Sequence, residues 1–141
     1  MPHISSKQIN EKDFKKIYNE LVSIFGNAGK NGNIVSLFEE FLTDTEKIML
    51  AKRLAVICMI YEEMPISYIW EILSMSPSTV TRISLGYEQG AYSVIIKLIK
   101  ENRQTVWDTV EEIIRNNIEK QTGKGRWKKL NKLSQKNNFH K

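Results

Sequence analysis

The segment from Ile66 to Leu85 constrains the fold more than any other part of the chain, because its pattern predicts two short helices joined by a tight turn. Ser76 is a favourable N-cap for the second helix. Pro77 suits the first helical position, because its ring fixes φ and leaves no amide hydrogen unpaired. Apolar side chains recur at spacings that would pack the two helices together: Ile69, Leu73, Met75, Val80 and Ile83. The segment is therefore predicted to be a helix-turn-helix.

The face of the second helix opposite Val80 and Ile83 repeats at helical spacing through Ser78, Thr81, Arg82 and Leu85, so it presents small hydroxyls and one arginine. Such a face suits a helix that lies in the major groove of DNA and reads base edges. The DNA-binding residues predicted in this segment are Ser67, Tyr68, Ser76, Ser78, Thr79, Thr81 and Arg82. The simpler alternative is an ordinary helical hairpin in which Ser76 and Pro77 only begin a helix.

Two positions depart from the usual helix-turn-helix pattern, which favours a small residue in the first helix and a glycine in the turn. Trp70 takes the place of the small residue, so its side chain must either point outward or require a wider angle between the helices. Ser74 takes the place of the glycine and can adopt the turn at some conformational cost.

The composition of the whole chain indicates a soluble globular protein. Its 141 residues are enough for one domain with a real core, and 41% of them are hydrophobic and 26% charged. No secretory signal is recognisable. The longest apolar run, Ile48 to Tyr61, is interrupted by Lys52 and Arg53 and is too short to span a bilayer. We therefore expect a cytoplasmic protein without a membrane partner.

Residues that could carry catalytic or metal chemistry are few. Cys58 has no partner cysteine in the chain and is interpreted as a buried small hydrophobe in a reducing compartment. His3 and His140 lie near opposite ends of the chain, so neither a zinc site nor a catalytic base is indicated. The sequence holds no glycine-rich phosphate loop and no nucleophile elbow. We expect no metal, no cofactor and no enzymatic activity.

The net charge of +5 is distributed unevenly along the chain. Residues 120–141 hold eight basic residues and no acidic one, which leaves 13 basic and 16 acidic residues in 1–119. A basic tail attracts DNA phosphates in a salt-dependent way, and Arg126, Lys128 and Lys129 are predicted contacts. The alternative is a disordered end that only keeps the protein soluble. With either role for the tail, we divide the chain into a helical domain, 1–119, and a basic tail, 120–141, that we expect to be disordered.

The segments before the helix-turn-helix also predict helices, and no alternating strand pattern is found. Asn10 can cap a first helix, which the flexible turn from Gly26 to Gly32 should end. The apolar stripe of this helix consists of Phe14, Ile17, Tyr18, Leu21, Val22 and Phe25. Asn33 should start a short second helix. Thr43 and Glu46 have the capping-box spacing, which predicts the start of a third.

Apolar residues cover most of the circumference of the third helix, which should end near Glu62 and be buried on nearly all sides. A dimer that interleaves its helices can surround such a helix more readily than a small monomer, so we expect a homodimer. After a loop from Gly86 to Gly90, Ser93 should cap a C-terminal helical segment, either one helix or two broken around Glu101–Gln104. That segment could pack on the dimer core or bind another protein.

Three separated motifs resemble those of the trp repressor superfamily: Leu42–Glu46, Met49–Arg53 and Ser76–Arg82. The resemblance covers about residues 34–92 and is closest to the smaller, generic branch of trp-repressor-like regulators. It implies an all-α fold, an intertwined helical homodimer with one DNA-reading helix per subunit. This chain adds a C-terminal helical segment and a basic tail. The resemblance also implies operator half-sites spaced to match the two-fold axis.

By the same resemblance, Thr43, Arg53 and Arg82 fall where tryptophan-sensing members line their ligand pocket. Arginine suits a carboxylate because its fork donates two parallel hydrogen bonds. Those members carry a glycine directly after the second arginine, whereas this chain has Ile83, a branched side chain that should crowd an indole. We therefore disfavour an amino-acid corepressor. A phosphate or base contact is expected for Arg82, and a surface ion pair or a phosphate contact for Arg53.

The sequence thus predicts a sequence-specific, DNA-binding transcriptional regulator, expected to be a repressor, that binds double-stranded DNA as a homodimer. Ser78, Thr81 and Arg82 would read base edges, while Ser67 and Tyr68 would contact phosphates. The alternative is a helical protein-interaction or replication/recombination accessory module whose basic tail binds DNA without sequence preference.

Overall fold

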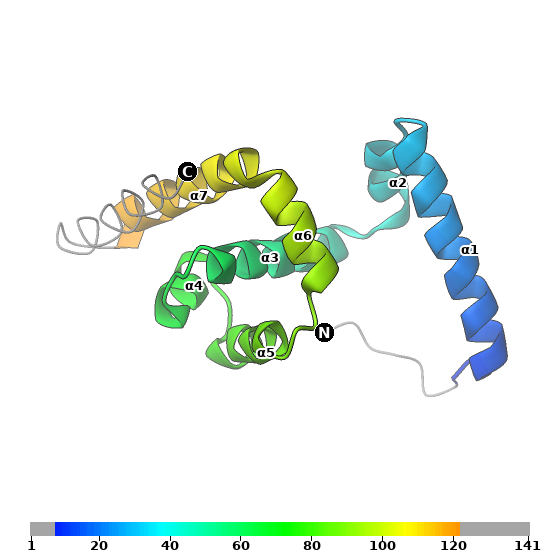
Figure 1. The fold of residues 1–141 in the computed structure, drawn as a ribbon, viewed down its shortest axis with the longest axis horizontal. Coiled ribbons are helices and arrows are strands. Elements are labelled where there is room, and N and C mark those ends of the chain that lie inside the picture. The colour runs from blue at the N-terminus through cyan, green and yellow to red at the C-terminus, as the bar shows by residue number, and fades with distance from the viewer. Residues whose placement is uncertain (1–7, 122–141) are drawn as a thin grey trace. The chain divides into compact units, whose positions relative to one another are not determined.

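The computed structural model describes the backbone of residues 8–121 and the side chains of residues 8–117. Within that range the chain forms seven α-helices and no strand, as the sequence predicts (Figure 1). They are α1 (Glu11–Lys30), α2 (Ile34–Phe41), α3 (Asp44–Tyr61), α4 (Ile66–Ile72), α5 (Pro77–Glu88), α6 (Ser93–Glu101) and α7 (Arg103–Gln121). None of these helices is long and apolar enough to cross a membrane. The chain divides into two compact units, Met1–Lys47 and Ile48–Lys141, which are described in turn.

The first helix starts where the sequence predicts but ends later. Oδ1 of Asn10 accepts a hydrogen bond from the Lys12 amide at 2.8 Å and so caps α1. The predicted turn from Gly26 to Gly32 is wrong up to Lys30, because α1 continues to that residue.

Packing between α1 and α2 explains why α1 passes through two glycines, each of which costs a helix about 1 kcal/mol relative to alanine. The Phe25 ring meets the rings of Phe38 and Phe41 edge-on, at centroid distances of 5.4 and 5.8 Å. Aromatic pairs of this kind contribute about 0.5–1.5 kcal/mol each beyond the area they bury. Ala28, one turn further on, is also buried. The helix ends at Lys30, and Gly32, two residues later, has a φ of +74°, the left-handed conformation that closes many helices.

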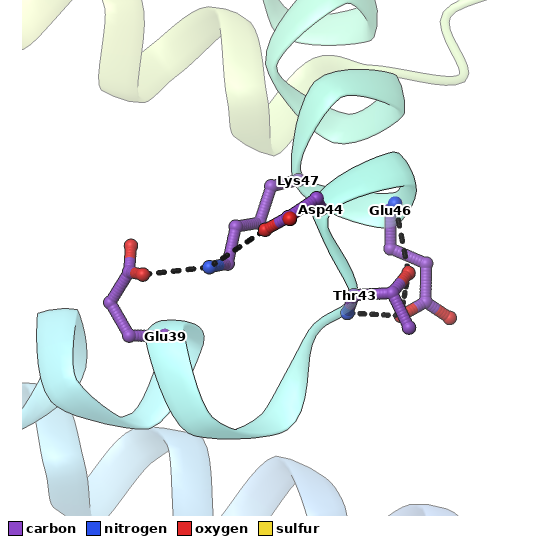
Figure 2. A network of polar contacts seen from close by, with 5 residues as sticks. All are labelled: Glu39, Thr43, Asp44, Glu46 and Lys47. Atoms are coloured by element: carbon purple, nitrogen blue, oxygen red, sulfur yellow. Dashed lines mark hydrogen bonds and ion pairs between the residues drawn. The ribbon is translucent and has the colours of Figure 1, made fainter.

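The start of α3 is fixed by a capping box, as predicted (Figure 2). The Thr43 N–H donates to Glu46 Oε2 at 2.8 Å, the Thr43 hydroxyl donates to the same oxygen at 3.0 Å, and the Glu46 N–H donates to Thr43 Oγ1 at 3.2 Å. The two bonds from Thr43, the backbone one first, hold the pKa of the Glu46 carboxyl below its ordinary value. Lys47 Nζ lies 2.7 Å from Glu39 Oε2 and 3.6 Å from Asp44 Oδ1, which ties α2 to the first turn of α3.

The second unit has its core around the C-terminal half of α3, where the four residues from Val56 to Met59 are all buried. Burial on every side of the helix is therefore confirmed for these four residues. The other buried apolar side chains that the structure describes in this unit are Met64, Ile69, Ile72, Leu73, Val80, Ile83, Ile99, Trp107, Val110 and Ile114. Closer to its N-terminus, α3 is not buried on all sides, because Ile48, Leu50 and Leu54 remain 42–55% exposed.

Two expectations about the chain after Leu85 are corrected. The predicted loop from Gly86 to Gly90 is wrong up to Glu88, because α5 continues to that residue. A Cβ on Gly86 would lie only 3.2 Å from the ring of Tyr92, so glycine is the residue that lets this ring lie against the helix. Ser93 is not a cap, since Tyr92 occupies the N-cap position of α6 and makes no side-chain capping bond.

The C-terminal segment consists of two helices, with the break at Asn102. The Asn102 N–H donates to the carbonyl oxygens of Leu98 and Ile99 at 3.2 and 3.1 Å, and its side-chain amide donates to that of Leu98 at 3.0 Å. The carbonyl oxygen of Asn102 in turn accepts a hydrogen bond from the Val106 N–H at 3.0 Å. Asn102 therefore closes α6 and starts α7, and α7 leaves it in a new direction (Figure 1).

Candidate DNA-binding surface

The fourth and fifth helices form the helix-turn-helix that the sequence predicts (Figure 1). The side chains expected to join them lie in the core or against it: Ile69, Leu73, Met75, Val80 and Ile83. Trp70 is half-buried against the same core, so the pair of helices accommodates its ring. The predicted packing of the motif is therefore confirmed.

The turn between α4 and α5 is closed by backbone hydrogen bonds around Ser74, which has a left-handed φ of +51°. The Ser74 N–H donates to the Glu71 carbonyl at 3.3 Å, and the Met75 N–H donates to the Trp70 carbonyl at 2.9 Å. This is the Schellman arrangement, in which glycine is the usual left-handed residue. Lys52 of α3 also reaches the turn, since its Nζ donates to the Ser74 carbonyl oxygen at 3.4 Å. Only the tertiary structure identifies Lys52 as a residue of this site.

Three hydroxyl groups gather at the N-terminus of α5. Ser76 caps the helix as predicted, because its Oγ accepts a hydrogen bond from the Thr79 N–H at 3.2 Å. The Ser76 hydroxyl also lies 2.7 Å from Thr79 Oγ1 and 3.3 Å from Ser78 Oγ. Ser76 and Ser78 are exposed, whereas Thr79 is half-buried. Ser76 and Thr79 therefore fix the start of the helix, whatever else they contact.

The outward face of α5 is exposed and carries polar side chains together with one apolar side chain, Leu85, which is 52% exposed. Ser78, Thr81 and Arg82 are exposed, while Val80 and Ile83 on the opposite face are buried. Among residues 8–117, the Arg82 guanidinium has no hydrogen-bond or ion-pair partner. An arginine that is exposed and unpaired can present all its N–H donors to a ligand.

The remaining predicted site residues are spread over several elements. Ser67 is exposed and Tyr68 half-buried on α4, while Arg53 is exposed on α3. Thr43 belongs to the first unit, where its hydroxyl is engaged with Glu46. A pocket that includes Thr43, Arg53 and Arg82 therefore stays a prediction. The predicted tail contacts lie outside the described residues: Arg126, Lys128 and Lys129.

Comparison with protein families identifies the group to which this arrangement belongs. The family model for the Trp repressor protein matches residues 16–100, which is more than half of the chain. The chain belongs to the Trp repressor protein family. This is a family of regulatory DNA-binding proteins, and the matched region contains the whole helix-turn-helix. Searches of curated proteins and of solved structures give no match.

The Trp repressor region ends before α7, which forms one wall of an apolar groove of about 740 Å³. Its lining residues include Leu54 and Cys58 of α3, Leu98 of α6, and Val106 and Ile113 of α7.

Burial raises the pKa of the Cys58 thiol to about 11, which keeps the thiol protonated and unreactive at neutral pH. No group of acidic, histidine or cysteine side chains within residues 8–117 is placed to hold a metal ion.

Proposed function

We propose that this member of the Trp repressor family is a sequence-specific transcriptional regulator, a repressor, that binds double-stranded DNA as a homodimer. The observation that carries the proposal is the outward face of α5, where Ser78, Thr81 and Arg82 are exposed. A helix of this kind fits the major groove of B-DNA. There, hydroxyl groups bond to several base edges, and arginine donates two hydrogen bonds to O6 and N7 of guanine.

Contacts to phosphates would hold α5 in the groove without reading sequence. Ser67 and Tyr68 at the start of α4 are the proposed phosphate contacts of the first helix, and the exposed hydroxyl of Ser76 is a third at the start of α5. Lys52 adds a positive charge at the turn. The tail residues Arg126, Lys128 and Lys129 would add salt-dependent affinity for any DNA sequence.

Exposed apolar side chains support the homodimer. In the first unit, Phe14, Ile17, Tyr18 and Val22 of α1 are 52–60% exposed. In the second unit, the exposed apolar side chains of α3 and α6 are Ile48, Leu50, Leu54, Val94 and Leu98. Monomeric proteins rarely expose contiguous apolar patches of more than a few hundred Å². A second copy that covers such surfaces would also supply a second α5, for half-sites about 34 Å apart.

The DNA proposal is tested by selecting random duplex DNA with the purified protein and with Arg82→Ala. Loss of one bidentate base contact costs about 1–3 kcal/mol, so Arg82→Ala should bind the selected site about 5- to 150-fold more weakly. Because Arg82 has no partner within residues 8–117, the unfolding midpoint should not change. Arg115→Ala on α7 is the matched control, because it removes another exposed arginine far along the chain from α5.

Recovery of a two-fold-symmetric motif that Arg82→Ala no longer selects, while Arg115→Ala still does, would support a dimeric regulator. Binding without sequence preference, equal in both variants and abolished by salt, would reject it. The protein would then be an accessory or protein-interaction module that meets DNA through its basic tail. In that case, deletion of residues 120–141 should remove all DNA binding.

The homodimer is tested separately by sedimentation equilibrium. Ile17→Glu places a charge in the exposed apolar stripe of α1 and should shift the protein to monomer. Asn19→Glu, on the same helix but outside the stripe, is the control and should leave the dimer unchanged. A wild-type protein that sediments as a monomer at micromolar concentrations would refute the proposed assembly.

A further inference from the structure

The last described helix, α7, lies outside the matched Trp repressor region and packs directly against α4 of the helix-turn-helix. Its inward face repeats at helical spacing through Arg103, Trp107, Val110 and Ile114. Trp107, Val110 and Ile114 are 3–7% exposed and belong to the same core cluster as Ile69 of α4. This helix, which follows the matched region, therefore covers the side of α4 that faces the core.

An ion pair marks the start of this contact. The Glu62 side chain is only 3% exposed, and its two carboxylate oxygens accept hydrogen bonds from Nε and Nη2 of Arg103 at 3.4 and 3.3 Å. Glu62 directly follows α3 in the short connection to α4, and Arg103 is the first residue of α7. The pair thus joins the connection that leads into α4 to the point where α7 begins.

Stability alone does not account for an ion pair whose carboxylate is buried, even though the Arg103 side chain is 33% exposed. Removing a carboxylate from water is costly, and apolar residues of similar volume often serve a fold equally well or better. An ion pair does contribute geometry, because a planar guanidinium opposite a carboxylate favours one orientation. An apolar face, in contrast, tolerates small shifts along its length. The Glu62–Arg103 pair can therefore select one register of α7 on α4 among several that would bury similar area.

We propose that Glu62 and Arg103 are positioning residues for DNA recognition: their ion pair fixes α7 in register on α4, and α4 in turn fixes the orientation of α5. The expected effect on DNA recognition rests on the proposed DNA-binding function. The positioning of α7 rests on the contact between Glu62 and Arg103. Neither residue contacts DNA in this scheme. Through α4, the helix α7 determines how precisely α5 is oriented toward the DNA.

The test replaces the pair with apolar residues, Glu62→Leu together with Arg103→Met. The expected result is a folded protein whose denaturation midpoint is equal to or above that of the wild type. Its ratio of specific to non-specific DNA affinity should fall about tenfold. Amide hydrogen exchange in α4 and in the first turn of α5 should be faster. The matched control is Glu111→Leu with Arg115→Met, which removes the i,i+4 pair on α7 itself. It should change neither the ratio of specific to non-specific DNA affinity nor the amide exchange of α4 and α5.

Wild-type specificity together with wild-type exchange in the double variant would overturn the inference. A parallel loss of midpoint and specificity would also overturn it, because the pair would then be only structural. If the double variant does not fold, Arg103→Lys supplies the test, since it keeps the charge and removes the fork. Its specificity ratio should fall at an unchanged midpoint, and an unchanged ratio counts against the proposal. If the wild type selects no DNA sequence, the proposed function fails, and amide exchange alone decides whether the pair holds α4.

Discussion

Replacing Ser74 by glycine should stabilise the protein, although the residue lies in the turn of the helix-turn-helix. Ser74 has a φ of +51°, a conformation that costs a residue with a Cβ roughly 1–2 kcal/mol. Its exposed side chain makes no hydrogen bond to the described residues, so glycine removes no contact. Glycine also gives the unfolded chain more freedom, which offsets about 0.4–1 kcal/mol. The net expectation is a gain of about 0.5–1 kcal/mol, or a rise of about 2–4 °C in Tm.

Gly90 provides a reciprocal control, because it occupies the same position after α5, with a φ of +78°. The Gly90 N–H donates to the Tyr87 carbonyl at 3.1 Å, and the Ala91 N–H donates to the Gly86 carbonyl at 2.9 Å. Gly90→Ser should therefore cost about what Ser74→Gly gains. Urea unfolding of the two single variants and the double variant measures this directly. If Ser74→Gly lowers the midpoint, or Gly90→Ser leaves it unchanged, left-handed strain does not govern these turns.

Three further predictions concern the core, the start of α3 and the buried thiol. Ile69→Ala should cost about 2–5 kcal/mol in urea unfolding, because Ile69 is 0% exposed, whereas Thr81→Ala on the exposed face should stay within about 0.5 kcal/mol. The lowered pKa of Glu46 means that its stabilising effect is full above the ordinary glutamate pKa and is lost as the pH falls through the lowered value. Unfolding measured across mildly acidic pH should show this loss, and Glu46→Gln, which has no carboxyl to titrate, should lack it. Because burial raises the pKa of Cys58 to about 11, iodoacetamide at pH 8 should label the native protein about a hundredfold more slowly than the urea-unfolded chain. Equal labelling rates by mass spectrometry would contradict the burial of Cys58.

Local hydrogen bonds explain which features the sequence could predict. Asn10, Thr43 and Ser76 each form a capping bond to a residue two or three positions away, so the pattern of a few letters contains the whole interaction. The packing of α4 on α5 was equally readable, because Ile69 and Val80 lie within one short segment whose spacing reports its own buried face. The outward hydroxyls and arginine of α5 followed from the same periodicity.

The predictions at two glycines are wrong because contacts with distant residues outweigh the local tendency of glycine to end a helix. The sequence around Gly26 predicts the end of a helix, but the ring of Phe25 packs on α2 and the helix continues. Gly86 predicts a loop, but its missing side chain instead leaves room for the ring of Tyr92. In both cases glycine signals either flexibility or close approach, and only the neighbouring segment decides between the two.

The sequence by itself determined the helical class, the caps at Asn10, Thr43 and Ser76, and the hydroxyls and arginine exposed on α5, because each depends on residues within one or two helical turns. Only the tertiary structure brought Lys52 to the turn at Ser74 and Arg103 to the carboxylate of Glu62, 22 and 41 residues apart along the chain. It alone also placed α7 against α4. Side-chain periodicity tells which face of a helix is buried, but not which other helix covers that face. That choice is made by the shapes and charges of segments that meet only in the folded protein.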